Sequence, residues 1–286
     1  MNAPAPSGPP LRITGFRELW LHTGTACNLA CPFCHEGSAP ADTRIAALAP
    51  TVARAAIDEA VARGVRRFVF TGGEPLILRG IVELLCHALA HRPALVLTNG
   101  TAPLIRRPQS LAQLRAMPNA LGFRVSIDHP DEHRHDAARG PRNFRRALQG
   151  LKLLHEAGFT VGVTRLWQPD ENTATVESRY REVFRKHGLP VELAIHALPD
   201  YARPGAHAVA FARPATTSAH PPACTHGRML IAHGDTASYL PCPLVDDDPR
   251  FALGSELGSA IAAPIDTCHS RCAVCRASGV DYAGPA

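Results

Sequence analysis

The chain has 286 residues, of which 45% are hydrophobic and 19% are charged, and its formal net charge is +5. This length and composition fit a globular protein with one substantial core and a smaller appended region. No apolar run is as long as a membrane span, the N-terminus does not resemble a signal peptide, and the arginines are scattered rather than gathered in a basic stripe. We therefore expect a cytoplasmic protein that binds neither membrane nor nucleic acid, with a short disordered tail at residues 1–12. Nine cysteines in such a chain indicate metal or redox sites rather than disulfides.

The first predicted element is an apolar, extended run at Leu19–Leu21, and a Thr/Gly turn leads from it to Cys27, Cys31 and Cys34. Three thiolates spaced C-x3-C-x2-C can bind one face of an iron–sulfur cluster, but they do not supply a fourth ligand. A four-iron cluster held in this way would keep one iron atom open to a small molecule. From these residues alone, two alternatives remain: a structural zinc site formed with His35, or a redox pair.

Strand and helix patterns then alternate along the chain. Strands are predicted at Val65–Phe70, Ala94–Leu97, Leu121–Ile127, Phe159–Thr164 and Val191–Ile195. Helices are predicted at Thr51–Arg63, Ile81–Ala90, Ser110–Met117, Asn143–Ala157 and Thr173–His187. Repeated strand–helix units predict a parallel sheet, and six of them fit an α/β fold with a partial (β/α)6 TIM-like barrel.

Polar residues follow the predicted strands at their C-terminal ends, where α/β barrels build their active sites. The turn TGGEP at Thr71–Pro75 combines two glycines, which allow close approach of a ligand, with the negative charge of Glu74. The same face is predicted to carry Thr98, Asn99, Ser126, Asp128, Arg165 and His196.

The cysteine spacing, the aromatic residue before the last cysteine and the Gly-Gly-Glu-Pro turn together resemble the radical S-adenosylmethionine (radical SAM) enzymes. The resemblance implies that SAM binds the open iron of a [4Fe-4S] cluster held by Cys27, Cys31 and Cys34, and is cleaved to a 5′-deoxyadenosyl radical. It also implies contacts to SAM from the following residues: Phe33, Gly72, Gly73, Glu74, Thr98 and Ser126. It also implies that Asp128 and Arg165 lie near SAM or the substrate. The catalytic candidates are Asp128, Arg165 and His196, and Arg203 is a further candidate for facing the substrate.

The segment Ser126–Gly140 is similar to the loop after the fourth strand in this family. His133 and His135 in it could bind a metal, but no acidic or histidine partner is evident. We expect a solvated loop.

A Pro-, Ala- and His-rich stretch divides the chain into a predicted partial barrel at residues 13–200, a linker at 201–222 and a cysteine-rich region at 223–286. In that last region Gly227–Ala232 and Ser238–Leu240 flank His233-Gly234-Asp235, which predicts a β-hairpin. Its cysteines are Cys224, Cys242, Cys268, Cys272 and Cys275.

A cysteine, a hairpin, a second cysteine and a later C-x2-C resemble the twitch domain, the shortened form of the SPASM domain. The resemblance implies an auxiliary [4Fe-4S] cluster bound by Cys224, Cys242, Cys272 and Cys275. Cys268 is a fifth candidate for four positions, and four thiolates would also suit zinc.

The leading hypothesis is therefore a radical SAM oxidoreductase that abstracts hydrogen from a small metabolite or a peptide, with the auxiliary cluster transferring electrons. A donor such as flavodoxin or ferredoxin is the expected electron source. The chain also resembles the enzymes that convert GTP to a pyranopterin precursor, but Trp20 and Val69 occupy positions where those enzymes place nucleotide-binding arginines. The alternatives are a SPASM-type peptide maturase and a non-catalytic zinc-stabilised protein.

Overall fold

The computed structural model describes residues 10–168, 170–206, 222–233 and 236–278. Its centre is one curved sheet whose strands lie in the order β6-β5-β4-β3-β2-β1-β7-β8. The strands are β1 Glu18–His22, β2 Arg67–Thr71, β3 Ala94–Thr98, β4 Leu121–Ser126, β5 Thr160–Leu166, β6 Ala194–Leu198, β7 Gly227–His233 and β8 Thr236–Leu240. All neighbouring pairs are parallel except β7 and β8, which form an antiparallel hairpin.

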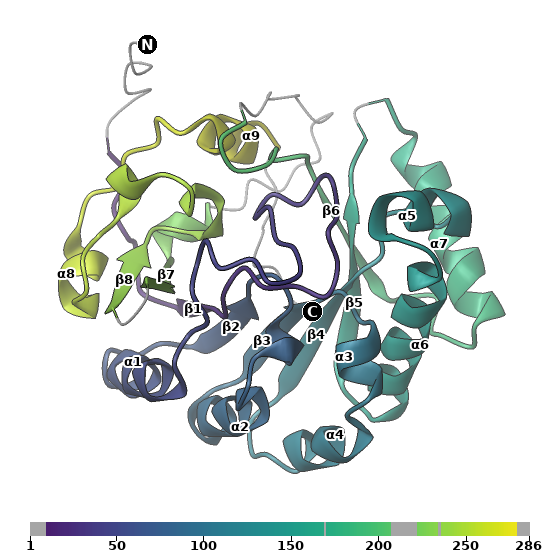
Figure 1. The fold of residues 1–286 in the computed structure, drawn as a ribbon, viewed down its shortest axis with the longest axis horizontal. Coiled ribbons are helices and arrows are strands. Elements are labelled where there is room, and N and C mark those ends of the chain that lie inside the picture. The colour runs from purple at the N-terminus through teal and green to yellow at the C-terminus, as the bar shows by residue number, and fades with distance from the viewer. Residues whose placement is uncertain (1–9, 169, 207–221, 234–235, 279–286) are drawn as a thin grey trace.

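Helices follow the strands and cover one face of this sheet, as an arc along the lower and right-hand rim of Figure 1. They are α1 Pro50–Ala62, α2 Ile81–His91, α3 Ala102–Ile105, α4 Pro108–Arg115, α5 Glu132–Arg139, α6 Asn143–Glu156 and α7 Thr173–Lys186. The C-terminal region adds α8 Leu257–Ala262 and α9 Ser270–Ser278, and the 3-10 turns are η1 Pro75–Ile77, η2 Ala223–Thr225, η3 Pro243–Val245 and η4 Pro249–Phe251. Strand, helix and parallel pairing together give the α/β partial barrel that the sequence predicts.

The two faces of the sheet have different coverings because alternate residues of a strand point to opposite sides. Leu19 and Leu21 of β1 pack with the helices on the outer face. Trp20, between them, packs on the inner face with Val69 and Met229. Other members of this inner cluster come from the C-terminal region: Leu244, Val245, Phe251 and Val274. The C-terminal region therefore closes the part of the half-barrel that lies under β1, β2 and β7.

Most predicted elements lie within a few residues of the observed ones, and two differences matter. The sixth strand begins at Ala194 rather than Val191, because Pro190 and the partly exposed Val191 precede the pairing with β5. The expected solvated loop at Ser126–Gly140 is wrong, because residues 132–139 form α5, which Asp131 caps by accepting a hydrogen bond from the Arg134 amide at 2.9 Å.

One sheet runs through both the predicted barrel and the predicted cysteine-rich region. β7 of the second region pairs directly with β1 of the first, with Gly227 level with Glu18. Leu11, in the predicted tail, forms a bridge with Ile265, whereas residues 1–9 lie outside the described residues. Most of the predicted linker and the Gly234-Asp235 turn also lie outside them.

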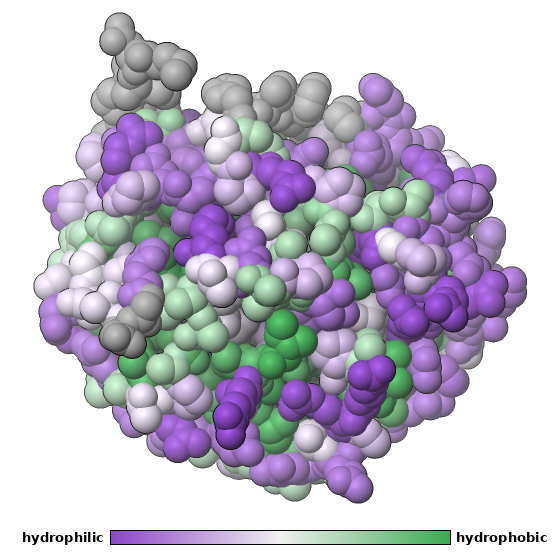
Figure 2. Space-filling model, viewed as in Figure 1, coloured by the Kyte–Doolittle hydropathy of each residue, from purple (hydrophilic) through white to green (hydrophobic). Residues whose placement is uncertain are grey.

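Hydrophilic residues occupy much of the rim of the face in Figure 2, over the helices, and apolar residues lie nearer its middle. This is the distribution expected of helices that bury one side against a sheet. Among the described residues, we find no helix with both the length and the apolar character needed to cross a membrane.

Candidate active site

A cleft of about 1040 Å³ opens at the C-terminal ends of β1 to β6. In Figure 1 the loop after β1 crosses the middle of this region, between the C-terminal elements and β5. The predicted site residues that line the cleft are Cys27, Cys31, Phe33, Cys34, Gly72, Gly73, Thr98, Ser126, Asp128 and Arg165. The structure therefore brings most of the predicted site to one place, as expected for strand ends in a barrel.

The cysteine loop and the TGGEP turn are joined by their backbones. Beyond the last residues of β1 and β2, Gly73 N donates to Gly24 O at 2.9 Å and Glu74 N donates to Ala26 O at 3.1 Å. A Cβ atom on Gly73 would lie 2.2 Å from Ala26 O, which no side chain can tolerate. The glycine is thus required by the approach of the cysteine loop itself.

Glu74 does not line the cleft but lies beneath it, almost completely buried. Its carboxylate accepts hydrogen bonds from the Asn99 amide at 2.8 Å, from the Thr98 hydroxyl at 2.8 Å and from the Leu76 amide at 3.1 Å. Burial raises the pKa of Glu74 despite these donors. In this geometry Glu74 fixes the end of β3 against the turn.

Asn99 extends the same network to the first cysteine. Its Nδ2 group donates to Asn28 Oδ1 at 2.9 Å and lies 3.8 Å from Cys27 Sγ. Its Oδ1 atom accepts from the Thr101 amide at 3.0 Å. The position of Cys27 is therefore set from β3 as well as from its own loop.

Burial raises the pKa of all three N-terminal thiols, that of Cys27 to about 12. A bound metal would displace these protons, since thiolates and not thiols are metal ligands. The sulfur positions also bear on which metal fits. In a tetrahedral zinc site neighbouring sulfurs are about 3.8 Å apart, given Zn–S bonds of about 2.3 Å.

Within the described part of the chain, Asp58, His87 and His91 have ligand atoms that all lie within 4.8 Å of one another. Neither set of cysteines contains three sulfurs that are this close together. Thiolates that each bind a different iron of one cluster are held further apart than thiolates on a single ion. A zinc ion on three of these cysteines would therefore require their sulfurs to come closer together than they lie here.

Asp128 and Arg139 form a two-pronged ion pair beside these cysteines. Arg139 donates to both carboxylate oxygens, with Nη2 to Oδ1 at 3.0 Å, and its guanidinium lies 5.5 Å from the centre of the Phe33 ring. The pKa of Arg139 is raised, because Asp128 and the sulfur of Cys31 outweigh the opposing effect of burial. This pair places a fixed positive group next to the predicted cluster.

Arg165 forms a second buried pair at the cleft wall. Its Nη1 atom donates to Glu171 Oε2 at 2.8 Å, and Nη2 donates to Oε1 of the same carboxylate. The pKa of Glu171 is lowered, because the bonds from Arg165 and the Gln168 amide outweigh the opposing effect of burial. Arg165 thus faces the cleft with its charge already matched by an acid.

His196 is placed differently from the other catalytic candidates. It lies in the middle of β6, level with Thr164 of β5, because this strand continues to Leu198 instead of ending at Ile195 as predicted. Thr164 and Leu198 line the cleft, whereas His196 does not.

A second cavity, of about 520 Å³, lies in the C-terminal region. Its walls include Cys224, Cys242, Cys272 and Cys275, with mostly apolar neighbours. Burial raises the pKa of Cys272 to about 12 and that of Cys242 well above its ordinary value. Cys268 does not line this cavity, and its nearest charged groups are Asp266 and Arg250.

Sequence reasoning missed several charged residues that support the site. His22 and Glu36 are buried under the cysteine loop, with His22 Nε2 2.8 Å from Glu36 Oε2. Burial alone would raise the pKa of Glu36, but His22, His35 and Arg44 lower it to about 2. A local signal existed only for Arg139, which ends the capped helix α5. His22 and Glu36 are 14 positions apart, and no pattern in the sequence links them.

Comparison with known proteins defines the class. The radical SAM superfamily model matches residues 21–183, more than half of the chain, so the chain belongs to the radical SAM superfamily. Members of this class use a [4Fe-4S] cluster and SAM.

Particular relatives share parts of the sequence. Mycofactocin maturase MftC of Mycolicibacterium smegmatis is 33% identical over 47% of this chain and 33% of its own length. An AdoMet-dependent heme synthase of Methanosarcina barkeri is 30% identical over 58% of this chain and 45% of its own. A GTP 3′,8-cyclase of M. smegmatis is 36% identical over 55% of this chain and 44% of its own. Each match covers less than half of the relative's length.

Solved structures share the fold at low identity. Streptococcus suis SuiB bound to S-adenosylmethionine has a TM-score of 0.61 and 15% identity, over 85% of this chain and 64% of that one. The anSMEcpe protein with bound AdoMet and the Kp18Cys peptide has a TM-score of 0.61 and 13% identity, over 86% of this chain and 78% of that one. These two structures therefore share the fold of this chain.

Proposed function

We propose that Cys27, Cys31 and Cys34 bind a [4Fe-4S] cluster whose fourth iron takes SAM, and that the enzyme removes a hydrogen atom from a substrate in the adjacent cleft. The observation that carries this proposal is the placement of three thiols, two of them buried, on the wall of the large cleft, where the described residues supply no fourth cysteine. When bound, the cluster supplies the electron and SAM supplies the 5′-deoxyadenosyl group that abstracts the hydrogen.

The chain's own residues would hold SAM beside the cysteine loop. Gly72 and Gly73 present bare backbone to the cleft, and the Thr98 side chain borders it. Phe33 offers an apolar face for the adenine, and Ser126 offers a hydroxyl one strand further. The Glu74 side chain lies beneath the cleft wall and would not contact SAM directly. It would act by holding the turn in place through hydrogen bonds and by its negative charge.

Substrate selection would fall to the half of the inner face that the C-terminal region leaves uncovered. Ser126 of β4 and Thr164 of β5 line the cleft there, as does the deeply buried Arg124. The paired residues Asp128 and Arg165 flank them. These polar groups suit a substrate with charged or hydrogen-bonding groups, such as a polar metabolite or a peptide.

We place a second [4Fe-4S] cluster at Cys224, Cys242, Cys272 and Cys275. Four thiolates would fill all four iron positions, so this cluster would exchange electrons without binding substrate. Cys268 stays outside this set, because it does not line the cavity that the other four share. In this scheme residues 13–200 form the catalytic region and residues 223–286 the electron-transfer region, with a flavodoxin or ferredoxin as the donor.

Peptide maturation is the second candidate function. It is favoured by the similarity to a maturase, MftC, and by a fold shared with anSMEcpe, whose structure contains a peptide. GTP is disfavoured, because Trp20 and Val69 are buried in the apolar part of the inner face.

Anaerobic reconstitution tests the proposal. We expect about eight iron atoms per chain for two four-iron clusters, and formation of 5′-deoxyadenosine from SAM under reductant. Candidate metabolites and peptides labelled with deuterium should transfer the label to 5′-deoxyadenosine when the correct substrate is present. Zinc held by the cysteines, and lost in Cys27→Ala or Cys242→Ala, without SAM cleavage would instead establish the zinc-stabilised protein.

A further inference from the structure

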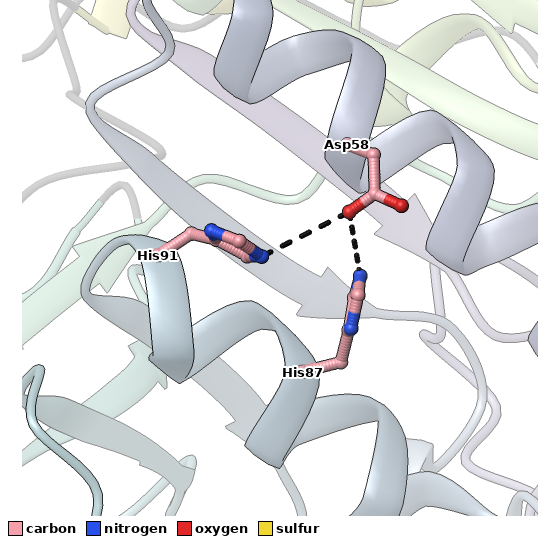
Figure 3. Close-up of side chains that lie close together, drawn as sticks. All are labelled: Asp58, His87 and His91. Carbon is pink, nitrogen blue, oxygen red and sulfur yellow. Dashed lines mark hydrogen bonds and ion pairs between the residues drawn. The ribbon is translucent and has the colours of Figure 1, made fainter.

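Asp58, His87 and His91 form a cluster on the outside of the half-barrel. Asp58 extends from α1 and the two histidines from α2, and Figure 3 shows both rings pointing toward the carboxylate. His87 Nε2 lies 2.7 Å and His91 Nε2 lies 3.9 Å from the same atom, Asp58 Oδ1. All three side chains are partly exposed, at 57%, 27% and 39% for Asp58, His87 and His91, so an ion could reach them from solvent.

The packing of the two helices produces this arrangement. Ala56 and Ala60 of α1 are buried small residues, which allows α2 to approach closely. His87 and His91 are one turn apart and therefore share one side of α2. Their rings pack edge to face with centroids 5.4 Å apart, which holds them near each other without a ligand.

The donor set identifies the class of ion. Two imidazole nitrogens and one carboxylate oxygen suit zinc and similar borderline divalent metals rather than magnesium or calcium. Neighbouring ligand atoms of a tetrahedral zinc ion bound by nitrogen and oxygen are about 3.3 Å apart, given bond lengths of about 2.0–2.2 Å. The observed separations of 2.7 and 3.9 Å lie on either side of this value, so small side-chain rotations complete the site.

We propose that Asp58, His87 and His91 bind one zinc-class divalent cation, with solvent water in the remaining position. The site binds rather than catalyses. Its histidine pair reads His-Ala-Leu-Ala-His, without the glutamate that serves as general base in zinc proteases, and none of the three residues lines the active-site cleft.

The position of the site suggests its effect. α1 follows the cysteine loop, and α2 follows the TGGEP turn. A cation shared between them would fasten together the two helices that lie behind the two SAM-binding loops. Because the ion binds only the folded chain, it would raise the thermal stability of the protein.

A simple hydrogen bond between His87 and Asp58 is the competing explanation, and the two differ in their response to metal. Reconstituted holoenzyme, whose cluster cysteines are already occupied, is titrated anaerobically with zinc chloride by calorimetry. We expect the unmodified protein to bind one zinc ion per chain. The affinity for zinc should be more than about tenfold weaker in His87→Ala and in His91→Ala.

His155→Ala is the matched control, because His155 is a half-buried histidine on α6 outside this cluster. It should bind zinc as the unmodified protein does. The melting temperature with and without zinc provides a second measurement. Zinc should raise it only in proteins that keep all three of Asp58, His87 and His91. Equal zinc isotherms for the unmodified protein and His87→Ala, or no zinc binding by the unmodified protein, would overturn the proposal. Neither measurement depends on the reaction proposed for the cleft.

Discussion

The two groups of cysteines in this molecule differ in number and in surroundings. The N-terminal group has three thiols on a cleft of about 1040 Å³ that also contains ion pairs and backbone glycines. The C-terminal group has four thiols around a cavity of half that size, among apolar residues such as Leu11 and Leu244. Under the proposed function, one ligand type would serve two tasks. The three thiols beside the larger cleft would hold the cluster that binds SAM, and the four thiols in the apolar cavity would hold a cluster that transfers electrons.

Arg271 connects the two groups. It precedes Cys272 on α9, is completely buried, and donates to His35 O at 2.8 Å, next to Cys34 in the other group. It also donates to Tyr201 O and Ala202 O, both at 3.0 Å. Tyr201 lines the active-site cleft, so one guanidinium holds parts of both sites in fixed relation.

The largest effect is expected from removing one of the three N-terminal thiols. Cys27→Ala should abolish SAM cleavage and reduce the iron content by about four atoms per chain, because two thiolates cannot hold a four-iron cluster. Iron analysis and chromatography of 5′-deoxyadenosine provide the measurements. Cys86→Ala, which removes a partly buried thiol on α2, is the control and should keep both properties.

Removing a C-terminal thiol should separate the two tasks. Cys242→Ala should lose the second cluster and substrate turnover, while slow SAM cleavage without substrate persists. Cys268→Ala should keep all of its iron, because Cys268 lies outside the cavity of the other four. If Cys268→Ala lost about four iron atoms and Cys242→Ala did not, the assignment of the auxiliary ligands would be wrong.

Removing the Arg271 side chain, which contacts parts of both sites, should mainly lower the stability of the protein. Arg271→Ala leaves Asp246, 3.3 Å away, as a buried carboxylate with fewer partners and leaves several carbonyls unpaired. Loss of one partner of a buried pair costs about 3–5 kcal/mol, which denaturant unfolding would measure. Arg250→Ala is the matched control, because the exposed Arg250 pairs with Asp248 at the surface, and it should destabilise the protein far less.

A smaller, pH-dependent effect is expected on the N-terminal side alone. His135 is buried, accepts a hydrogen bond from the Asp128 amide at 3.2 Å, and has its pKa lowered to about 4 by burial and by Arg139. The unfolded chain binds this proton more tightly, so stability is complete above pH 6.5 and decreases as pH falls toward 4.

The loss should be about 1–3 kcal/mol, measured as the free energy of unfolding at several pH values. His135→Gln cannot titrate in this range and should have a flatter profile. A parallel decline in both proteins would show that His135 is not the titrating group.

Much of this site was predictable because its signals are local. The cysteine spacing, the Gly-Gly-Glu-Pro turn and the polar residues at strand ends lie within short segments, and parallel strands bring those ends together. His196 shows the limit, since a strand boundary shifted by three residues moved it from the strand end to mid-strand.

The contacts that link the two regions were not predictable, because their partners are brought together by the fold. Arg271 and the His35 carbonyl that it donates to are 236 positions apart, and the ion pair of Arg44 and Asp246 joins residues 202 apart. Helix α5 was missed for another reason: its sequence EHRHDAAR lacks an apolar periodicity, and its one strongly buried side chain is a histidine. The pairing of β7 with β1 likewise joins segments with no shared local pattern.

The most direct test of the account is electron paramagnetic resonance of the reduced, reconstituted protein before and after SAM is added. We expect two cluster signals, of which one changes on SAM binding and disappears in Cys27→Ala, while the other is unaffected by SAM and disappears in Cys242→Ala. If SAM altered neither signal, or altered the one that depends on Cys242, the claim that the three-thiol site holds the open iron would be contradicted.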